Sequence, residues 1–438
     1  MFRKLVWMTL IFSTGAFAAD GVVNGYIGGL SNQASSNVGN VPGNRYNGSF
    51  EFDYYNKPVS TYEKESRFTF ASQYNDQSLT QYSLQEAYVG GRLSEQNYWK
   101  VGRQILTWSD VDANWGFGKL NNRRNFDYFN PGQEGLIGLS LERQSSNGMK
   151  YRVFGSPIYA PELNPGLDIN KGDKTITSRS QWGNPPAQDT TIPGGATVPI
   201  EYRVDYPSIG KVIYRYTVGA NVGFENKHWK VDNFIIRKPE NQISVKVDAK
   251  LNTIEQVVKA NVRPQFYYHD VYGTTVKWRN KDVEVYGSGI AIRPNTFPDG
   301  DTQAFQYTEI KTEKRREDYV GGGISKTNDL YGIGLNYVAR LSPFDRQKEQ
   351  LAEDPRWNQA VNVTAYRALS SKVTVFGDVK YDMLTTDRLV MVKATYLMTK
   401  NFQLMAGANS IGTPTNGKSY WSPYTNNDSV YGALRYIF

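Results

Sequence analysis

Apolar and polar residues alternate at every second position through most of the chain after residue 20. In 372–381, Val373, Val375 and Val379 occupy one set of alternate positions, and polar side chains fill most of the other set. This period of two predicts β-strands with one apolar and one polar face, and helical spacing is nearly absent. Comparable runs occur at 49–55, 243–250, 257–266, 283–292, 331–338, 361–367 and 390–398.

The length of these runs indicates the fold class. They approach the roughly 9–11 residues that a tilted strand needs to cross a bilayer, whereas a soluble sheet usually has strands of about five or six. Only a closed barrel pairs every backbone donor and acceptor in lipid. The pattern therefore predicts an all-β fold, a transmembrane antiparallel β-barrel formed by 19–438. The strand length disfavours a soluble β-sandwich, and the absence of a short repeat disfavours a β-helix.

The connections between the strands fall into a long and a tight class, and counting strands places all the long ones on one side. This is the pattern of outer-membrane barrels, which have long external loops and short periplasmic turns. The count gives about twenty strands, and about eighteen fits equally well because the boundaries from 241 to 280 are soft. The long connections are 31–45, 106–134, 157–208, 294–316, 342–356 and 412–427, and the tight ones include 93–97, 145–148, 226–228, 280–282, 327–329, 369–372 and 399–401.

Composition agrees with a wall that is wet on one side. Hydrophobic residues make up 39% of the chain, but aromatic residues make up 14%, with 31 Tyr. Rings with a polar end suit the boundary between lipid and water. The chain has no cysteine, which excludes disulfides, Cys-based metal sites and a Cys nucleophile. It has two histidines. We expect no metal and no cofactor. The formal net charge is +8, but the basic residues form no continuous tract, so no nucleic-acid partner is expected.

The first eighteen residues have the order of a secretory signal peptide. Arg3 and Lys4 precede an apolar stretch, and Ala16-Phe17-Ala18 follows it. The apolar stretch is shorter than the roughly 20 residues of a membrane-spanning helix. We therefore predict export and cleavage after Ala18, which leaves a barrel in the outer membrane of a Gram-negative cell.

One motif match is judged accidental. GTPTNGKS, residues 412–419, fits the phosphate-loop pattern G-x-x-x-x-G-K-[ST]. That chemistry needs a helix after the loop, so that N–H groups at the helix start face the phosphates. The sequence that follows contains Pro423 and two Asn and predicts no helix. No nucleotide partner is expected.

Catalytic patterns are also missing. The sequence has no G-x-S-x-G and no H-E-x-x-H motif. The strand count places His228 in a tight turn and His269 near a long loop, so the two imidazoles are expected at opposite ends of the barrel. We predict a protein without catalytic residues, and an outer-membrane hydrolase is the least favoured alternative.

The connection 106–134 combines charges and rings in the way that a pore constriction would use them. Carboxylates and arginines that face each other across a narrow passage create a transverse field, and rings offer a track for sugar faces. An ordinary exposed loop is the competing interpretation. The long connection 157–208 is expected to form a lid or a surface for partners. The constriction candidates are Asp110, Asp112, Arg123, Arg124 and Trp108.

The stretch 101–144 resembles part of the large outer-membrane channel families of the alginate-export type. The matching positions are Gly102-Arg103-Gln104, Trp108, Asp110 and Asn130-Pro131. The resemblance covers about a tenth of the chain. It implies passive or facilitated passage of a small hydrophilic solute.

The polar faces of the clearest strands carry more basic than acidic residues. Rings of positive side chains favour anions, so the solute class is expected to include anions. A structural or adhesive surface barrel with a plugged lumen is the main alternative to a channel. The basic residues expected to line the lumen are Lys246, Lys250, Lys259, Arg263, Lys372, Lys380, Lys393 and Arg435.

The chain ends on an alternating strand, SVYGALRYIF, with an aromatic last residue. Leu434, Tyr436 and Phe438 are expected to face lipid, with Arg435 on the lumen side. The ending resembles the signal by which the barrel-assembly machinery recognises its substrates, except at Gly432, which is small. The expected partners are thus this machinery, outer-membrane lipid and lipopolysaccharide, and a small hydrophilic solute.

Overall fold

The computed structural model describes residues 20–31, 45–56, 65–75, 79–125, 127–129, 131–165, 167–170, 172–192, 194–295, 302–304, 307–311, 316–343, 354–414, 419–425 and 427–438. The predicted signal peptide, 1–18, lies outside these ranges, as do residues 415–418 of the phosphate-loop match.

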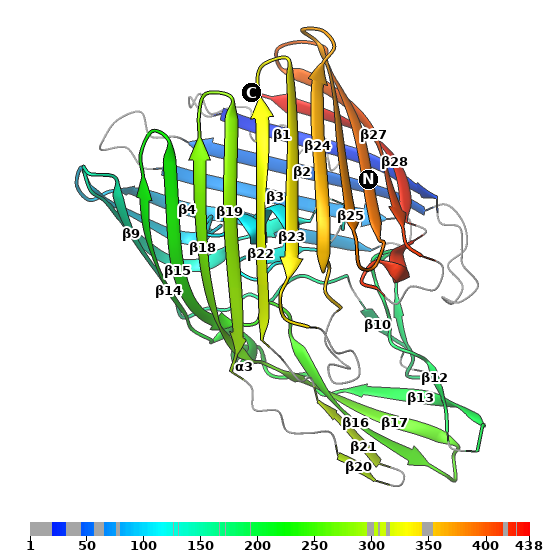
Figure 1. The fold of residues 1–438 in the computed structure, drawn as a ribbon. Coiled ribbons are helices and arrows are strands. Elements are labelled where there is room, and N and C mark those ends of the chain that lie inside the picture. The colour runs from blue at the N-terminus through cyan, green and yellow to red at the C-terminus, as the bar shows by residue number, and fades with distance from the viewer. Residues whose placement is uncertain are drawn as a thin grey trace.

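Eighteen antiparallel strands form one closed sheet (Figure 1). Each strand pairs with its neighbours around the barrel, and β1 pairs with β28, which closes the sheet. The prediction of a β-barrel with about eighteen strands is confirmed. The strands are β1 (Asp20–Ser31), β2 (Arg45–Asn56), β3 (Glu65–Asn75), β4 (Thr80–Arg92), β5 (Asn97–Gln104), β8 (Leu136–Gln144), β9 (Met149–Ser156), β14 (Thr217–Glu225), β15 (Trp229–Pro239), β18 (Tyr268–Arg279), β19 (Val283–Pro294), β22 (Glu317–Thr327), β23 (Tyr331–Arg340), β24 (Gln359–Ala368), β25 (Val373–Asp382), β26 (Arg388–Leu397), β27 (Phe402–Gly412) and β28 (Asp428–Ile437).

The two ends of the barrel differ in the length of their connections. All seven predicted tight connections join strands at one end, which we call the turn end. The six predicted long connections join strands at the other end, the loop end. The strand count alone was thus sufficient to sort these connections, although it missed one further long connection between β15 and β18.

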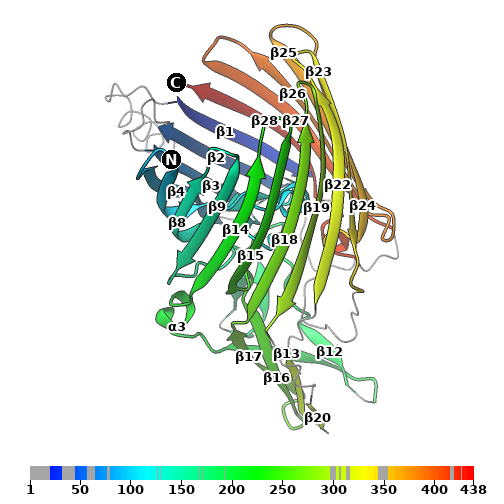
Figure 2. The same cartoon turned by 60° about the vertical axis from the view of Figure 1, so that its left-hand side comes forward.

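That missed connection contains two of the predicted barrel strands. β16 (Ser244–Asn252) and β17 (Val257–Gln265) lie in a separate six-stranded sheet outside the barrel, which we call the external sheet (Figures 1 and 2). β15 pairs directly with β18, from Trp229 opposite Trp278 to Pro239 opposite Tyr268. The prediction that 243–250 and 257–266 form barrel strands is therefore wrong. The other strands of the external sheet are β12 (Asp189–Thr191), β13 (Thr197–Val204), β20 (Thr302–Ala304) and β21 (Tyr307–Lys311).

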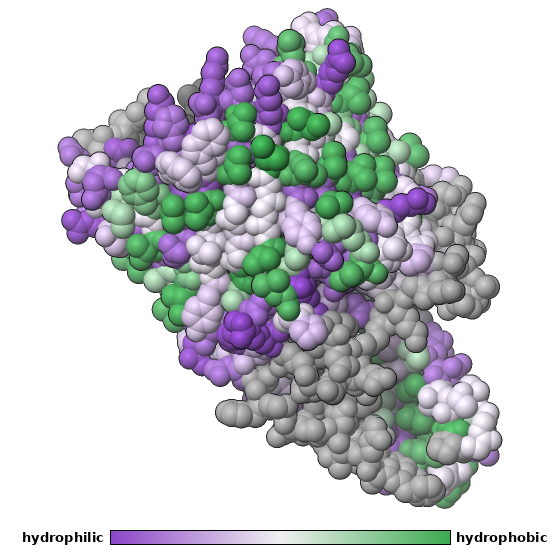
Figure 3. All heavy atoms as spheres, in the orientation of Figure 1, coloured by the Kyte–Doolittle hydropathy of each residue, from purple (hydrophilic) through white to green (hydrophobic). Residues whose placement is uncertain are grey.

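Large apolar side chains cover the outer face of the barrel. On neighbouring strands, Ile324, Leu335 and Val363 are exposed, and the alternate residues between them turn inward. Figure 3 shows apolar residues across the middle of the wall formed by these strands. Monomeric soluble proteins rarely expose so extended an apolar surface.

Aromatic rings collect on the outer face near the turn end. Trp229 lies opposite Trp278 in the sheet, and Tyr331 and Tyr396 are exposed at the same end. Rings of this kind at strand ends are typical of the boundary between lipid and water.

The C-terminal strand continues the outward apolar row. Leu434, Tyr436 and Phe438 are exposed on alternate positions of this end of the chain. Tyr436 packs on Phe402, with 4.8 Å between the ring centroids, and Phe438 stacks on Phe52 at 6.3 Å.

The remaining elements are short and belong to the connections. No helix among the described residues is both long enough and apolar enough to cross a membrane. These elements are β6 (Asn122–Arg124), β7 (Gly132–Glu134), β10 (Leu167–Ile169), β11 (Ile176–Ser178), the helices α2 (Asp110–Trp115) and α3 (Ile209–Ile213), and one 3-10 turn, η1 (Ser422–Tyr424).

Candidate functional site

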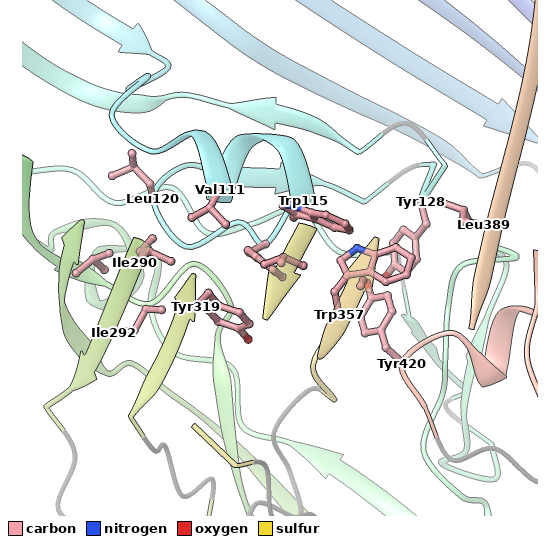
Figure 4. Packing of buried hydrophobic residues seen from close by; sticks show 14 of the residues in the cluster. Val111, Trp115, Leu120, Tyr128, Ile290, Ile292, Tyr319, Trp357, Leu389 and Tyr420 are labelled. Atoms are coloured by element: carbon pink, nitrogen blue, oxygen red, sulfur yellow. The ribbon is translucent and has the colours of Figure 1, made fainter. Parts of the chain in front are cut away.

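The connection between β5 and β8, residues 105–135, folds into the barrel (Figure 4). Its helix α2 packs against β19 and β22, far around the wall from β5 and β8. Ser109 caps this helix by accepting a hydrogen bond from the N–H of Asp112. Gly116 ends it at φ 61°, a left-handed conformation that favours glycine. The predicted constriction loop therefore lies in the lumen.

Asp112 shapes this inner loop from within. Its carboxylate accepts hydrogen bonds from the N–H groups of Lys119 and Leu120, at 2.8 and 2.9 Å. The side chain is fully buried, and this burial raises the pKa of Asp112. Asp112 therefore stabilises the return of the chain after α2 and does not face an open passage.

Three ion pairs attach the inner loop to widely separated strands. Asp110 lies 3.3 Å from Lys277 on β18, and Lys119 lies 2.9 Å from Glu317 on β22. Arg124 lies 2.8 Å from Glu51 on β2. Since these partners come from distant parts of the wall, the inner loop extends across the lumen.

Arg123 is used inside the loop assembly. It pairs with Glu162, in the connection between β9 and β14, at 3.0 Å, and both side chains are almost fully buried. Lys238 on β15 donates a hydrogen bond to the carbonyl of Leu120 at 2.9 Å. The predicted arrangement, in which carboxylates and arginines of the loop face each other across a passage, is therefore not observed. Asp110, Arg123 and Arg124 each form an ion pair that holds the loop in place.

A cluster of buried rings surrounds the inner loop. Trp108 packs on Phe234 of β15, with 6.0 Å between ring centroids. Trp115 meets Trp357 edge-on at 5.9 Å (Figure 4). Tyr128 stacks on Trp182, with 4.9 Å between ring centroids. Inward apolar residues at the loop end of the wall complete the cluster: Phe154, Ile236, Val271, Ile290, Ile292, Val338, Ala360, Leu389 and Ile411.

Arg356 joins two more connections to this cluster. It belongs to the connection between β23 and β24 and donates hydrogen bonds to the carbonyls of Tyr128 and Gly116, at 2.8 and 3.3 Å. Its guanidinium carbon lies 4.9 Å from the centroid of Trp421, which belongs to the connection between β27 and β28. Four connections therefore meet inside the loop end of the barrel, and we call this assembly the loop plug.

Between the loop plug and the turn end, the inner wall from β3 to β15 carries charged side chains that form ion pairs with one another. Arg67 lies 3.0 Å from Glu86, and Lys100 lies 3.1 Å from Glu65. Farther along the wall, Arg152 lies 2.6 Å from Asp232. Basic and acidic side chains alternate across neighbouring strands, so this arc has little net charge.

The opposite arc of the wall is largely neutral. The hydroxyl of Tyr286 donates to the side-chain oxygen of Asn336, at 3.1 Å. Asn336 donates in turn to Asn362 at 3.1 Å, and Asn362 donates to Asp378 at 2.8 Å. This chain of hydrogen bonds links β19 with β23, β24 and β25.

Three of the eight predicted lumen cations face the lumen. Arg435 lies opposite Asn24, which lies opposite Glu51, and Glu51 contacts the inner loop. By the same register, Lys380 and Lys393 belong to the inner face of β25 and β26.

The other five predicted lumen cations lie elsewhere, and that part of the prediction is wrong. Lys372 precedes β25 in a tight turn. The remaining four lie on β16 and β17 in the external sheet: Lys246, Lys250, Lys259 and Arg263.

The two histidines lie at opposite ends of the barrel. His228 is in the tight turn before β15, and His269 is at the loop end of β18. Within the described ranges, no group of three or more histidine and carboxylate side chains is placed to hold a metal ion.

Most of the partners that position the inner loop could not be predicted from the sequence. Glu317, Glu162 and Lys277 lie far from the inner loop in sequence, and only the closed register brings them to it. Arg356 follows a polar stretch and looks like an ordinary loop residue. A single usable signal existed, which was the concentration of Trp and Tyr in three connections at 106–134, 357 and 420–424.

No protein-family model and no curated protein sequence matches the chain. Porins are among its structural neighbours. OccAB3 of Acinetobacter baumannii is 7% identical, with a TM-score of 0.48, and covers 96% of this chain and 99% of its own. OmpF of Salmonella typhi, in complex with daunomycin, is 8% identical, with a TM-score of 0.46, and covers 96% and 97%. A mutant of the Rh. blastica porin is 10% identical, with a TM-score of 0.41, and covers 96% and 100%.

At these identities and scores the likeness carries no argument about function. The barrel itself is established by the pairing of its own strands. The resemblance of 101–144 to alginate-export barrels has no family model behind it and stays a prediction.

Proposed function

We propose that this chain is an outer-membrane channel through which small hydrophilic solutes diffuse without chemical change. The observation that carries the proposal is the contrast between the two faces of a closed sheet. The outer face presents Ile324, Leu335 and Val363, and the inner face presents paired charges and amides such as Asn336 and Asn362. A lipid-facing wall around a polar interior is the architecture of outer-membrane pores.

The inner loop supports the proposal because it narrows a barrel that would otherwise be wide. Barrel diameter grows with the number of strands, and eighteen strands enclose more space than side chains alone fill. A loop held by ion pairs to β2, β18 and β22 sets the size of any passage that remains.

We further propose a mild preference for anions, carried by the arc from β25 to β28. Lys380, Lys393 and Arg435 lie on the inner face there, and the paired arc from β3 to β15 adds little net charge. Cationic side chains along a pore lower the barrier to anions.

Conductance of the reconstituted full-length protein tests the channel. Stepwise currents in a planar bilayer are expected from the intact chain, with larger steps from a variant in which a short Gly-Ser linker replaces 106–134. Failure of both proteins to conduct, when both show the heat-modifiable mobility of a folded barrel, would contradict the proposal.

A plugged surface barrel is the second candidate, and the loop plug favours it. Four connections bury their rings together across the loop end, which suits a structural or adhesive protein with a closed lumen. In the same experiment, an intact chain that does not conduct and a shortened variant that does would support this alternative.

We also propose that the last strand addresses the chain to the barrel-assembly machinery. Leu434, Tyr436 and Phe438 form an exposed alternating row at the turn end, where a receptor could bind before the barrel closes. Deletion of Phe438 should lower the amount of heat-modifiable barrel in the membrane, and an unchanged amount would refute this role.

A further inference from the structure

Four large apolar side chains stand exposed on the segment that leads into β14. Tyr206 and Tyr214 are each 78% exposed, Ile209 is 74% exposed and Tyr216 is 51% exposed. We call these four residues the rim patch. The short helix α3 lies within this segment and has no buried residue, so the segment contributes nothing to a protein core.

The rim patch continues the outer face of the barrel. On β14, Val218 and Val222 are exposed at alternate positions, and Tyr216 and Tyr214 follow the same alternation beyond the loop end of the strand. Tyr216 packs on Tyr268 of β18, with 4.9 Å between ring centroids. Figure 2 shows α3 at the loop end of β9 and β14, beside the wall.

Backbone hydrogen bonds fix the segment in this place. The N–H of Tyr159 donates to the carbonyl of Ile213 at 2.8 Å, and the N–H of Asp205 donates to the carbonyl of Val262 at 2.9 Å. The exposure of the rings therefore belongs to a segment tied down at both ends.

Two cations accompany the rings. Lys211 is exposed on α3 and forms no ion pair with the described residues. Arg215 donates a hydrogen bond from Nε to the carbonyl of Lys211 at 3.1 Å, and its guanidinium carbon lies 4.2 Å from the centroid of Phe266. Tyr and basic residues together are what the headgroup region of an anionic leaflet attracts.

We propose that the rim patch is a lipid-docking surface that enters the headgroup region of the outer leaflet, with Lys211 and Arg215 at lipid phosphates. The inference rests on the proposed membrane location of the barrel. Continuity with the apolar wall favours lipid as the occupant over a soluble partner, because any protein bound there would have to displace lipid from the neighbouring strands. The patch would set the depth and tilt of the barrel on its β9–β14 side.

The absence of cysteine allows a direct test by site-specific labelling. Three single variants, Ile209→Cys, Ile254→Cys and Leu335→Cys, each carry an environment-sensitive fluorophore in the full-length protein. The protein is reconstituted in phosphatidylcholine vesicles with and without phosphatidylglycerol. Quenching by lipids that carry a nitroxide in the headgroup or in the acyl chain is compared with quenching by aqueous iodide.

Each label tests a different statement. Leu335 is on the outer wall, and its label should be quenched from the acyl chain. Ile254 is 94% exposed between β16 and β17, and its label should respond only to iodide. The label at position 209 should be quenched severalfold more by headgroup nitroxide than the label at 254. An unquenched label at 335 would overturn the membrane barrel itself, whereas a quenched 335 with an iodide-sensitive 209 would overturn only the rim patch.

A charge variant tests the phosphate contact. Adding Lys211→Glu to the labelled Ile209→Cys protein should reduce headgroup quenching more in vesicles with phosphatidylglycerol than in pure phosphatidylcholine. An equal effect in both vesicles would refute the contact with anionic phosphates. Protection from iodide without any lipid quenching would show that another protein copy covers the patch and would overturn the proposal.

Discussion

Two hairpins of similar length and alternation have different locations in this molecule. The hairpin β25–β26 forms part of the barrel wall, whereas the hairpin β16–β17 lies in the external sheet. Both alternate valine with lysine, and in both the lysines share one face. Their neighbours separate them: β24 and β27 extend the first hairpin into the barrel, while β13 and β21 pair with the second over five residues each.

The difference shows that alternation reports a two-faced sheet and not the solvent on its apolar face. Aromatic residues carry the information about lipid. The wall hairpin has Tyr381 and Tyr396 exposed on its outer face, but neither β16 nor β17 has a single aromatic residue. Pro264 in β17 is a second sign, because proline is rare inside a strand paired on both sides.

The largest expected difference is between removing the external hairpin and removing the wall hairpin. Replacement of 243–266 by a short Gly-Ser turn should leave a folded barrel, since β15 and β18 already pair with each other. Replacement of 372–398 removes two wall strands and should abolish the heat-modifiable form. If loss of 243–266 also abolishes it, the external sheet is part of the folding unit and the comparison fails.

A charge on the apolar face of each hairpin should have unequal costs. Val379→Arg puts a guanidinium on the exposed outer face of β25 and should lower the free energy of unfolding by about 2–4 kcal/mol. Val247→Arg, on β16, should cost less than about 1 kcal/mol. Urea titration of both proteins in the same vesicles measures the two values, and equal losses would place β16 in lipid as well.

Neutral substitutions of basic residues should separate the barrel wall from the external sheet in their effect on ion selectivity. Lys393→Gln combined with Arg435→Gln should move the reversal potential in a salt gradient toward cations, because both side chains belong to the inner face of the wall. Lys250→Gln combined with Lys259→Gln should leave it unchanged. A shift from the second pair alone would mean that the external sheet controls entry.

The smallest effect is expected from an exposed ion pair of the external sheet. Glu255 lies 2.5 Å from Lys259, and water and salt screen both side chains. Glu255→Gln should therefore leave the urea midpoint unchanged within error. A clear loss would indicate that this pair orders the turn between β16 and β17.

The barrel could be predicted from the sequence because its constraint is local: each strand must alternate and must be long. The long and tight connections could be sorted for the same reason. The location of 243–266 could not be predicted, because alternation there is equally good in water. Five of the eight predicted lumen cations lie away from the inner face, four as a consequence of that one error and Lys372 because its strand starts one residue later.

The candidate site was reached in outline only. Composition drew attention to 106–134, and the loop does lie inside the barrel. The role of Arg123 was beyond reach, because its partner Glu162 belongs to another connection. The role of Asp112 was missed for a different reason: its partners are backbone N–H groups of its own loop, which no residue pattern marks. Glu162 lies 39 residues from Arg123 and Lys238 lies 118 residues from Leu120, so no local pattern relates them to the loop.

The loop plug also has a consequence for the order of folding. Trp421 reaches Arg356 from the connection before the final strand, and β1 finds β28 only when the whole chain has been made. Contacts between residues so distant in sequence form late, because the entropy of closing the intervening loop must be lost first. We therefore expect the ring cluster to be completed late in assembly. Protection of Trp421 from oxidation would mark the moment at which a barrel has finished closing.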